Sequence, residues 1–266
     1  MSGPSDDFTA ASTWQPLRPG VTAGEVPASW AQGRASFGGL VAAIAVRPML
    51  AHVPVDRWLR SLNVTFVAPL ASAPAECSTA VLREGRALSS LESRITQEGS
   101  VCAIATAAFT ADRPTTALIE PPTAPVRATG KVVPYTEGLM PRFLQHFELR
   151  WDSTEPVEAG KPDAHILGAC RFPNDARDAD VCDVLALLDV WPPALMTIVK
   201  TFKTGSTVSW TVDFPFRDIK GRTDEFWSYD VRALAAGGGY GQTQAWLWDP
   251  SGRAVARSMQ LVAVFE

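Results

Sequence analysis

The sequence predicts an α+β protein of two tandem units, each a long antiparallel sheet wrapped around one buried helix. Three observations lead to this fold class. The chain has 266 residues, which suits two domains of about 110–150 residues. Its two halves repeat a sequence pattern. Each half also has one apolar helical segment ahead of runs with strand alternation.

The repeat has a long period. The hexapeptide SLNVTF at Ser61–Phe66 is matched by SWTVDF at Ser209–Phe214, 148 residues later. Beyond each hexapeptide, a pair of glycines 14 residues apart brackets the next strand pattern. Matching order and spacing over two stretches of about 50 residues indicate a duplicated unit.

Each half has one helix candidate. In the first half it is Phe37–Ala51, which is rich in alanine and apolar nearly all round, so we expect it to be buried. In the second half it is Asp183–Val199. Pro192 and Pro193 cannot lie within an unbroken helix, so we expect a break there.

Each half is predicted to end in a long antiparallel hairpin. The runs Val101–Phe109 and Ala254–Phe265 follow polar turns at Gln97–Ser100 and Asp249–Gly252. Asp-Pro-Ser-Gly is a favourable turn sequence, because proline presets φ and glycine accepts a positive φ.

These elements predict the domain organisation. One apolar helix wrapped by a long antiparallel sheet is the hotdog arrangement, and pairing two such sheets edge to edge covers an open edge of each. We therefore expect a double hotdog, with an N-terminal hotdog at 1–113 and a C-terminal hotdog at 142–266. The segment 114–141 holds six prolines and is predicted to be a linker.

Composition excludes several functions. A net charge of −4 without a Lys/Arg cluster argues against nucleic acid as a partner, because such binding depends on neutralised phosphates. No apolar run reaches the roughly 18–20 residues of a membrane span. The polar, acidic N-terminus does not resemble a secretory signal. We therefore expect a cytoplasmic protein with no membrane partner.

The four cysteines and three histidines also suggest no metal site. No cysteine pair has CxxC spacing, and the histidines are scattered along the chain. Reduced cysteines packed as small apolar residues are the expected outcome.

Three motifs carry a family resemblance. They are Phe37-Gly38-Gly39 at the start of the first helix, Leu82-Arg83-Glu84-Gly85-Arg86, and GRAVARSMQ at Gly252–Gln260. Together with the duplication, they resemble the double-hotdog acyl-CoA thioesterases of the bacterial thioesterase II type and the broader thioesterase-like superfamily. The resemblance runs from about Trp30 to the C-terminus. It implies hydrolysis of acyl-CoA in lipid metabolism, no cofactor other than the coenzyme A of the substrate, and a possible homodimer or higher homo-oligomer.

The resemblance also implies a site. In that family an Asp on the second helix, a Ser or Thr on the following strand and a Gln on the last strand hold the nucleophilic water. The matching positions here are Asp189, Thr207 and Gln260. Ser209 and Thr211 are expected on the same strand face as Thr207 by two-residue alternation, so either is an alternative hydroxyl.

The chemistry suits these residue types. An acid in an apolar run is a better base, because burial disfavours its charged form, and it can take a proton from water. Backbone N–H groups of Gly38 and Gly39 at a helix start could stabilise an oxyanion. Arg86 is assigned to substrate binding at the coenzyme A phosphates.

Each assignment has a structural alternative. Asp189 could cap the helical turn that begins at Pro192 and Pro193. The two glycines could serve only close helix–sheet packing, and Arg86 could lie on a solvated strand turn.

The repeat predicts one site per chain. The position equivalent to Gln260 is Ala107, and the first helix carries no acid. Half one would then supply walls of the site.

Two other functions remain open. A non-catalytic module that binds acyl-CoA or an acyl carrier could have the same fold. A hotdog hydratase or dehydratase ranks last, because no histidine is suitably placed. The acyl group, and the choice between coenzyme A and a carrier protein, stay open.

Overall fold

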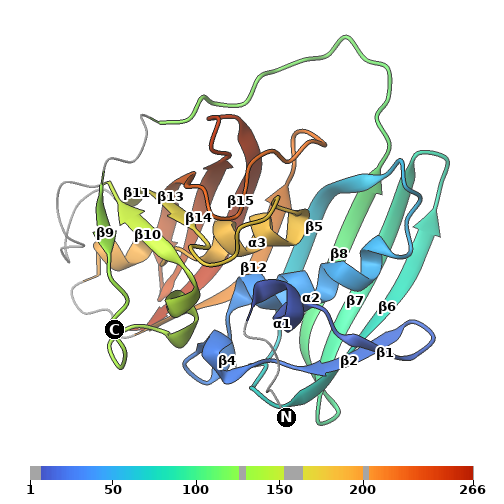
Figure 1. Cartoon of the computed structure of the whole chain (residues 1–266), viewed down its shortest axis with the longest axis horizontal. Coiled ribbons are helices and arrows are strands. Elements are labelled where there is room, and N and C mark those ends of the chain that lie inside the picture. The colour runs from blue at the N-terminus through green and yellow to red at the C-terminus, as the bar shows by residue number, and fades with distance from the viewer. Residues whose placement is uncertain (1–6, 126–129, 153–163, 200–203, 266) are drawn as a thin grey trace.

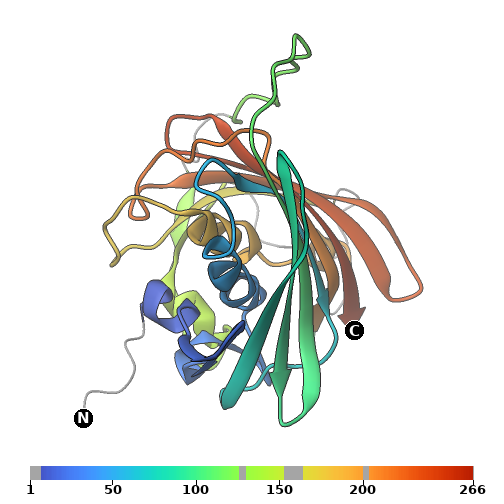
Figure 2. The same cartoon turned by 90° about the vertical axis from the view of Figure 1, so that its right-hand side faces the viewer.

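The computed structural model describes residues 7–125, 130–152, 164–199 and 204–265. Within them, thirteen strands form one antiparallel sheet in the order β1-β2-β6-β7-β8-β5-β12-β15-β14-β13-β11-β10-β9. The sheet curves around two long helices, as Figures 1 and 2 show. A separate two-stranded hairpin, β3-β4, lies beside it. The predicted fold class, a tandem hotdog of α+β type, is confirmed.

The first half contributes α1 (Phe8–Ser12), β1 (Gln15–Arg18), β2 (Val21–Glu25), η1 (Ala28–Trp30), β3 (Ala31–Gln32), β4 (Ala35–Ser36), α2 (Gly38–Leu50), β5 (Trp58–Phe66), β6 (Pro74–Glu84), β7 (Leu88–Gln97) and β8 (Ser100–Thr110).

The second half contributes β9 (Lys131–Val133), η2 (Arg142–His146), β10 (Glu148–Trp151), β11 (His165–Arg171), α3 (Val181–Asp189), η3 (Ala194–Thr197), β12 (Thr204–Asp213), β13 (Trp227–Gly237), β14 (Tyr240–Trp248) and β15 (Ala254–Phe265).

The repeated hexapeptides form the seam between the halves. They lie in β5 and β12, which pair antiparallel with Ser209 opposite Thr65 and Asp213 opposite Ser61. This pairing joins the two sheets edge to edge, so neither central strand presents an open edge. The two copies of the repeated hexapeptide thus pair with each other at the contact between the two halves.

The two predicted hairpins are confirmed. β7 pairs with β8, and β14 pairs with β15, each along nearly its whole length. The carboxylate of Asp249 organises the second turn by accepting the backbone N–H groups of Ser251 and Arg253 at 2.9 and 3.0 Å.

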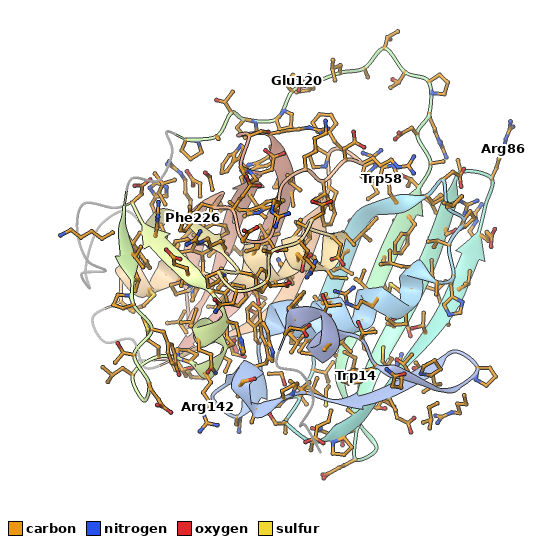
Figure 3. The ribbon with its side chains drawn as sticks, in the orientation of Figure 1. Trp14, Trp58, Arg86, Glu120, Arg142 and Phe226 are labelled. Atoms are coloured by element: carbon orange, nitrogen blue, oxygen red, sulfur yellow. The ribbon has the colours of Figure 1, made fainter. Side chains whose placement is uncertain are left out.

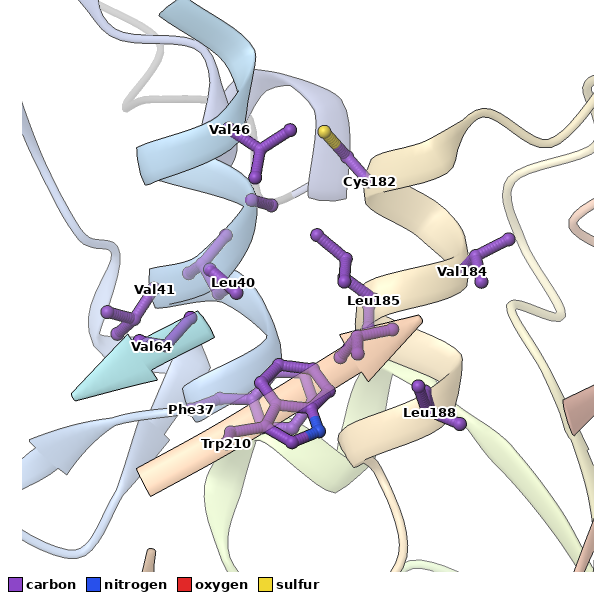
Figure 4. Close-up of a cluster of buried hydrophobic side chains, with 14 of the residues drawn as sticks. Phe37, Leu40, Val41, Val46, Val64, Cys182, Val184, Leu185, Leu188 and Trp210 are labelled. Carbon is purple, nitrogen blue, oxygen red and sulfur yellow. The ribbon is translucent and has the colours of Figure 1, made fainter. Parts of the chain in front are cut away.

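Both helices are buried, as their composition predicts. They pack against each other beneath the sheet, and Figure 4 shows their apolar side chains facing one another. The first runs almost as predicted. The second begins earlier than the predicted Asp183, because Asp180 caps it and forms a reciprocal capping box with Asp183. It ends at Asp189, and a separate turn, η3, follows Pro192 and Pro193. No helix in the described segments is long and apolar enough to cross a membrane.

The segment predicted as a linker has two contacts with the second half. Its residues Lys131–Val133 form β9, which pairs with β10 at the edge of the sheet. The indole Nε1 of Trp248 donates to the carbonyl of Pro122 at 2.8 Å. The linker therefore lies against the second half at two places, while its boundaries at 114 and 141 stay a prediction.

Gly39 sets how closely the two helices approach. A Cβ at this position would lie 2.8 Å from the Cα of Ala186 on α3 and 2.7 Å from the ring of Phe37. Backbone cannot move away as a flexible side chain can, so only glycine fits at this crossing.

We predict that Gly39→Ala destabilises the protein by about 1–3 kcal/mol, because overpacking outweighs the gain in helix propensity. Urea unfolding followed by circular dichroism measures the change. Gly237→Ala is the matched control, since a Cβ there meets nothing within 4 Å. Equal stability of the Gly39 variant and wild type would show that the helices can separate at little cost.

Candidate active site

A cavity of about 2190 Å³ opens where the start of α2 meets the end of α3. Both halves line it, from the β3-β4 hairpin and the end of β5 to η3 and β15. Asp189, Thr207, Gln260 and Gly38 all lie on its wall. The structure thus brings the three predicted water-holding residues to one cavity.

Asp189 is held from both halves of the chain. The side-chain amide of Gln260 donates to Oδ1 of Asp189 at 2.7 Å. The backbone N–H of Gly39 also donates to this carboxylate. A Cβ on Gly38 would lie 2.6 Å from Oδ2, so the absence of a side chain there leaves room for the acid.

The environment of Asp189 raises its pKa towards neutral pH. Burial raises the pKa of Asp189 to about 7, and the hydrogen bonds from Gln260 and Gly39 partly offset this rise. A carboxyl with this pKa is ionised in about half of the molecules at pH 7 and can accept a proton from water.

Asp189 does not cap the following turn. η3 has Pro193 at its N-cap and no side-chain cap hydrogen bond. The carboxylate is instead directed to Gln260 and Gly39. The carboxylate oxygens of Asp189 can therefore accept further hydrogen bonds from a molecule in the cavity.

A β-bulge decides which hydroxyl faces the site. Thr207 pairs with Val262 on β15, whereas Ser209 pairs with Leu261, so Val208 is an extra residue. Because cross-strand partners share a face and alternate residues share a face, Thr207 lies on the same side of the sheet as Gln260.

The expectation that Ser209 and Thr211 share the face of Thr207 is wrong, because the bulge shifts the alternation by one residue. Ser209 and Thr211 lie on the opposite face. There the hydroxyl of Thr211 donates to Oδ1 of Asn63 at 2.8 Å. Of the three candidates, only Thr207 lines the cavity.

The two glycines take different places. Gly38 lies on the cavity wall, but Gly39 is buried. The N–H of Gly39 favours the charged form of Asp189, and its assignment to an oxyanion stays a prediction. Gly39 also positions the acid and permits the helix crossing.

Arg86 is not brought to the cavity. It is exposed on the turn between β6 and β7, and it is not among the residues that line the wall. Figure 3 shows its side chain pointing outward at the end of that hairpin. Of the two interpretations of Arg86, the structure agrees with the second, a charged residue on a solvated strand turn.

Sequence reasoning missed the aromatic neighbours of Asp189. Trp191 lines the cavity and stacks on Tyr229 with ring centroids 5.3 Å apart. Burial, with a further contribution from the nearby charge of Asp189, raises the pKa of Tyr229 well above its usual value. Trp191 could have been found by its spacing of two residues from Asp189, but nothing in the sequence pairs it with Tyr229.

Among the described residues, none forms a matching site at the opposite end of the helix pair. Ala107 lies opposite Leu62, as Gln260 lies opposite Trp210 in the other half. This register confirms the predicted equivalence of Ala107 and Gln260.

Apolar and paired groups take the place of the acid at that opposite end. Figure 4 shows Val46 at the end of α2 directed towards Cys182 at the start of α3. Beside them, the guanidinium Nη1 of Arg47 and the carboxylate Oδ2 of Asp180 form an ion pair at 3.1 Å. Within the described residues, the set Asp189, Thr207 and Gln260 therefore occurs at one end of the helix pair, where α2 begins and α3 ends.

Solved structures share this fold over nearly the whole chain. A conserved protein of unknown function with a hot dog fold from Alicyclobacillus acidocaldarius is 23% identical, with a TM-score of 0.84 over 97% of this chain and 98% of that one. The acyl-CoA thioesterase II TesB2 of Mycobacterium marinum is 18% identical, with a TM-score of 0.74 and coverage of 97% and 98%. The tesB protein of Mycobacterium avium subs paratuberculosis is 18% identical, with a TM-score of 0.76 and the same coverage.

The sequence itself matches two domain families. No curated protein matches the chain. Residues 26–110 match the N-terminal domain of acyl-CoA thioesterases, and residues 120–264 match their C-terminal domain. The second match alone covers more than half of the chain, and the two occur in the expected order. The chain therefore belongs to the acyl-CoA thioesterase family.

Proposed function

We propose that the protein hydrolyses acyl-CoA thioesters to a free acid and coenzyme A, using a water activated by Asp189 and positioned by Thr207 and Gln260. The observation that carries this proposal is a carboxyl with a pKa of about 7 on a cavity wall, held by Gln260 at 2.7 Å. Membership of the acyl-CoA thioesterase family supports the reaction class.

The first step is attack on the carbonyl. Asp189 takes a proton from the water, and the water oxygen forms a bond to the thioester carbon. The carbonyl oxygen becomes an oxyanion in a tetrahedral intermediate. Gly38 is the first residue of α2, so its N–H has no acceptor within the helix. We assign this N–H to the oxyanion, which its location on the cavity wall supports.

The second step is loss of the thiol. The intermediate collapses, the carbon–sulfur bond breaks, and the carbonyl re-forms as a carboxylic acid. The proton held by Asp189 passes to the departing sulfur, which leaves as the thiol of coenzyme A. Asp189 returns to its ionised form, and the new acid loses its proton to solvent.

Gln260 and Thr207 serve orientation. Gln260 fixes Oδ1 of Asp189, which leaves the other carboxylate oxygen for the water. Thr207 reaches the same cavity from β12 because of the bulge at Val208. Holding the water and the acid in one geometry can lower the barrier by several kcal/mol. A cytoplasmic location and a homo-oligomer stay predictions.

The first prediction of this proposal concerns turnover. Asp189→Asn should lower kcat about 10²–10⁴-fold, because the base is lost while the shape is kept. Gln260→Ala should also lower kcat strongly, because the carboxylate is no longer held. Thiol release from short, medium, long and aryl acyl-CoAs, followed with a thiol reagent, measures both.

Two matched controls test whether the effect is local. Gln242→Ala changes an exposed glutamine opposite Leu261, away from the cavity, and Asp218→Asn changes an exposed aspartate. Both should retain turnover. If wild type binds a thioether analogue of acyl-CoA but hydrolyses none of the panel, the protein is a binding module and the proposal fails.

The second prediction concerns pH. Because Asp189 acts in its ionised form, kcat/KM should rise with pH through about 7 and then level off. Rates from pH 5.5 to 8.5 with one acyl-CoA measure the profile. A flat profile across this range would be incompatible with Asp189 as the base.

The third prediction concerns stability. The pKa of Asp189 is raised from 3.8 to about 7 in the folded protein, so the folded state binds the proton more tightly than the unfolded state. The stability that this proton contributes is lost as pH rises from about 4 to 7. Relative to Asp189→Asn, wild type should therefore lose about 1–2 kcal/mol between pH 5.5 and 8. Urea unfolding at both pH values measures this, and parallel curves for the two proteins would refute a raised pKa.

A further inference from the structure

Charged side chains gather at the mouth of the cavity. Apart from Asp189, the wall carries three cations, Arg34, Lys131 and Arg142, and two acids, Glu137 and Asp152. The three cations are exposed to solvent, and an exposed residue on a cavity wall lies at its opening. Among the described residues that line the cavity, these five side chains sum to one positive charge, in a chain whose net charge is −4.

Lys131 and the two arginines reach the wall from three different elements. Lys131 pairs across the strands with Trp151, the residue before Asp152. Arg34 lies on the β3-β4 turn, and Arg142 is the first residue of η2. These elements come from different halves of the chain.

The hairpin and η2 are packed together. β3 contacts η2 directly, and the side-chain amide of Gln145 donates to the carbonyl of Ser29 at 3.1 Å and to that of Arg142 at 2.9 Å. The ring of His146 stacks on Trp30 at 4.0 Å between centroids. These contacts hold the backbones of Arg34 and Arg142 in fixed relation.

The same packing ties both arginines to the candidate active site. Phe143, next to Arg142, stacks on Phe37 with centroids 4.3 Å apart. Phe37 directly precedes Gly38, and Arg34 lies only four residues before Gly38. Both arginines therefore lie on segments that adjoin or pack against the start of α2.

Within the described residues, neither arginine forms an ion pair. Nine other arginines form ion pairs, namely Arg18, Arg47, Arg60, Arg94, Arg171, Arg177, Arg222, Arg232 and Arg257. In the described part of the chain, no carboxylate lies within ion-pair distance of Arg34 or Arg142. Figure 3 shows Arg142 at the surface, directed outward.

We infer that Arg34 and Arg142 bind the phosphate groups of coenzyme A while the thioester lies at Asp189, an inference that rests on the proposed function. Guanidinium groups match phosphate oxygens with two parallel hydrogen bonds. The pantetheine arm of coenzyme A keeps its phosphates away from its sulfur, so groups that bind the phosphates belong at the opening of the cavity whose wall carries Asp189. The two arginines take the role that the sequence assigned to Arg86.

The test compares two thioesters of one acyl group, an acyl-CoA and the acyl-pantetheine that lacks the nucleotide and its phosphates. Arg34→Ala and Arg142→Ala should each raise KM for acyl-CoA about 10-fold, and the double variant about 100-fold, because charge-assisted hydrogen bonds are lost. The kcat on acyl-CoA should stay within about twofold of wild type. The kcat and KM on acyl-pantetheine should also stay within about twofold of wild type. Arg86→Ala is the matched control and should change nothing.

Three results would overturn the inference. An unchanged KM for acyl-CoA in the double variant would show that the arginines do not contact the phosphates. An equal loss on both thioesters would show a structural role. Wild type that prefers an acyl-carrier protein to acyl-CoA, with that preference lost in the double variant, would assign the arginines to a carrier protein.

Failure of the proposed function is separable from failure of this inference. If wild type hydrolyses neither thioester, calorimetric titration with coenzyme A still compares wild type, the double variant and Arg86→Ala. Binding that weakens only in the double variant supports the phosphate site without any turnover, and equal binding in all three refutes it.

Discussion

The pairing of β5 with β12 is the constraint on which the rest of the structure depends. It joins two sheets into one, and the curvature of that sheet leaves the two helices beneath it in contact. Because the helices run antiparallel, the start of one lies beside the end of the other. The N–H of Gly39 thereby reaches Asp189, and a strand adjacent to the seam supplies Gln260. The site exists only where both halves meet.

The pKa of Asp189 results from two opposing effects. Burial disfavours its charge, while the amide of Gln260 and the N–H of Gly39 favour it. A fully solvated carboxylate would be a weak base, and a buried one without donors would stay protonated at neutral pH. The start of a helix also carries partial positive charge, which favours an anion there. Gly39, which lets the helices approach, thus also lowers the pKa that burial raises.

Sequence patterns predicted the features that follow from the periodicity of one segment or from the repeat between the halves. The apolar helices, the two hairpins and the equivalence of Ala107 with Gln260 follow from composition and spacing. Thr207 was separated from Ser209 only in the structure, because a bulge breaks the alternation on which the prediction relied. The arginines at the cavity mouth were missed for another reason. Arg34 and Arg142 are 108 residues apart, and only the packing of two irregular segments brings them to one opening.

The helix end without the polar set shows what fusion allows. In a symmetric pair of identical single hotdogs, every substitution appears at both ends of the helix pair at once. Here each half is encoded separately, so Val46 and Cys182 can fill one end with apolar contacts while Asp189 occupies the other. A buried acid lowers stability at neutral pH, and the fused chain bears that loss once instead of twice. Asymmetry between the halves thus places the residues of the proposed site at one end of the helix pair and apolar contacts at the other.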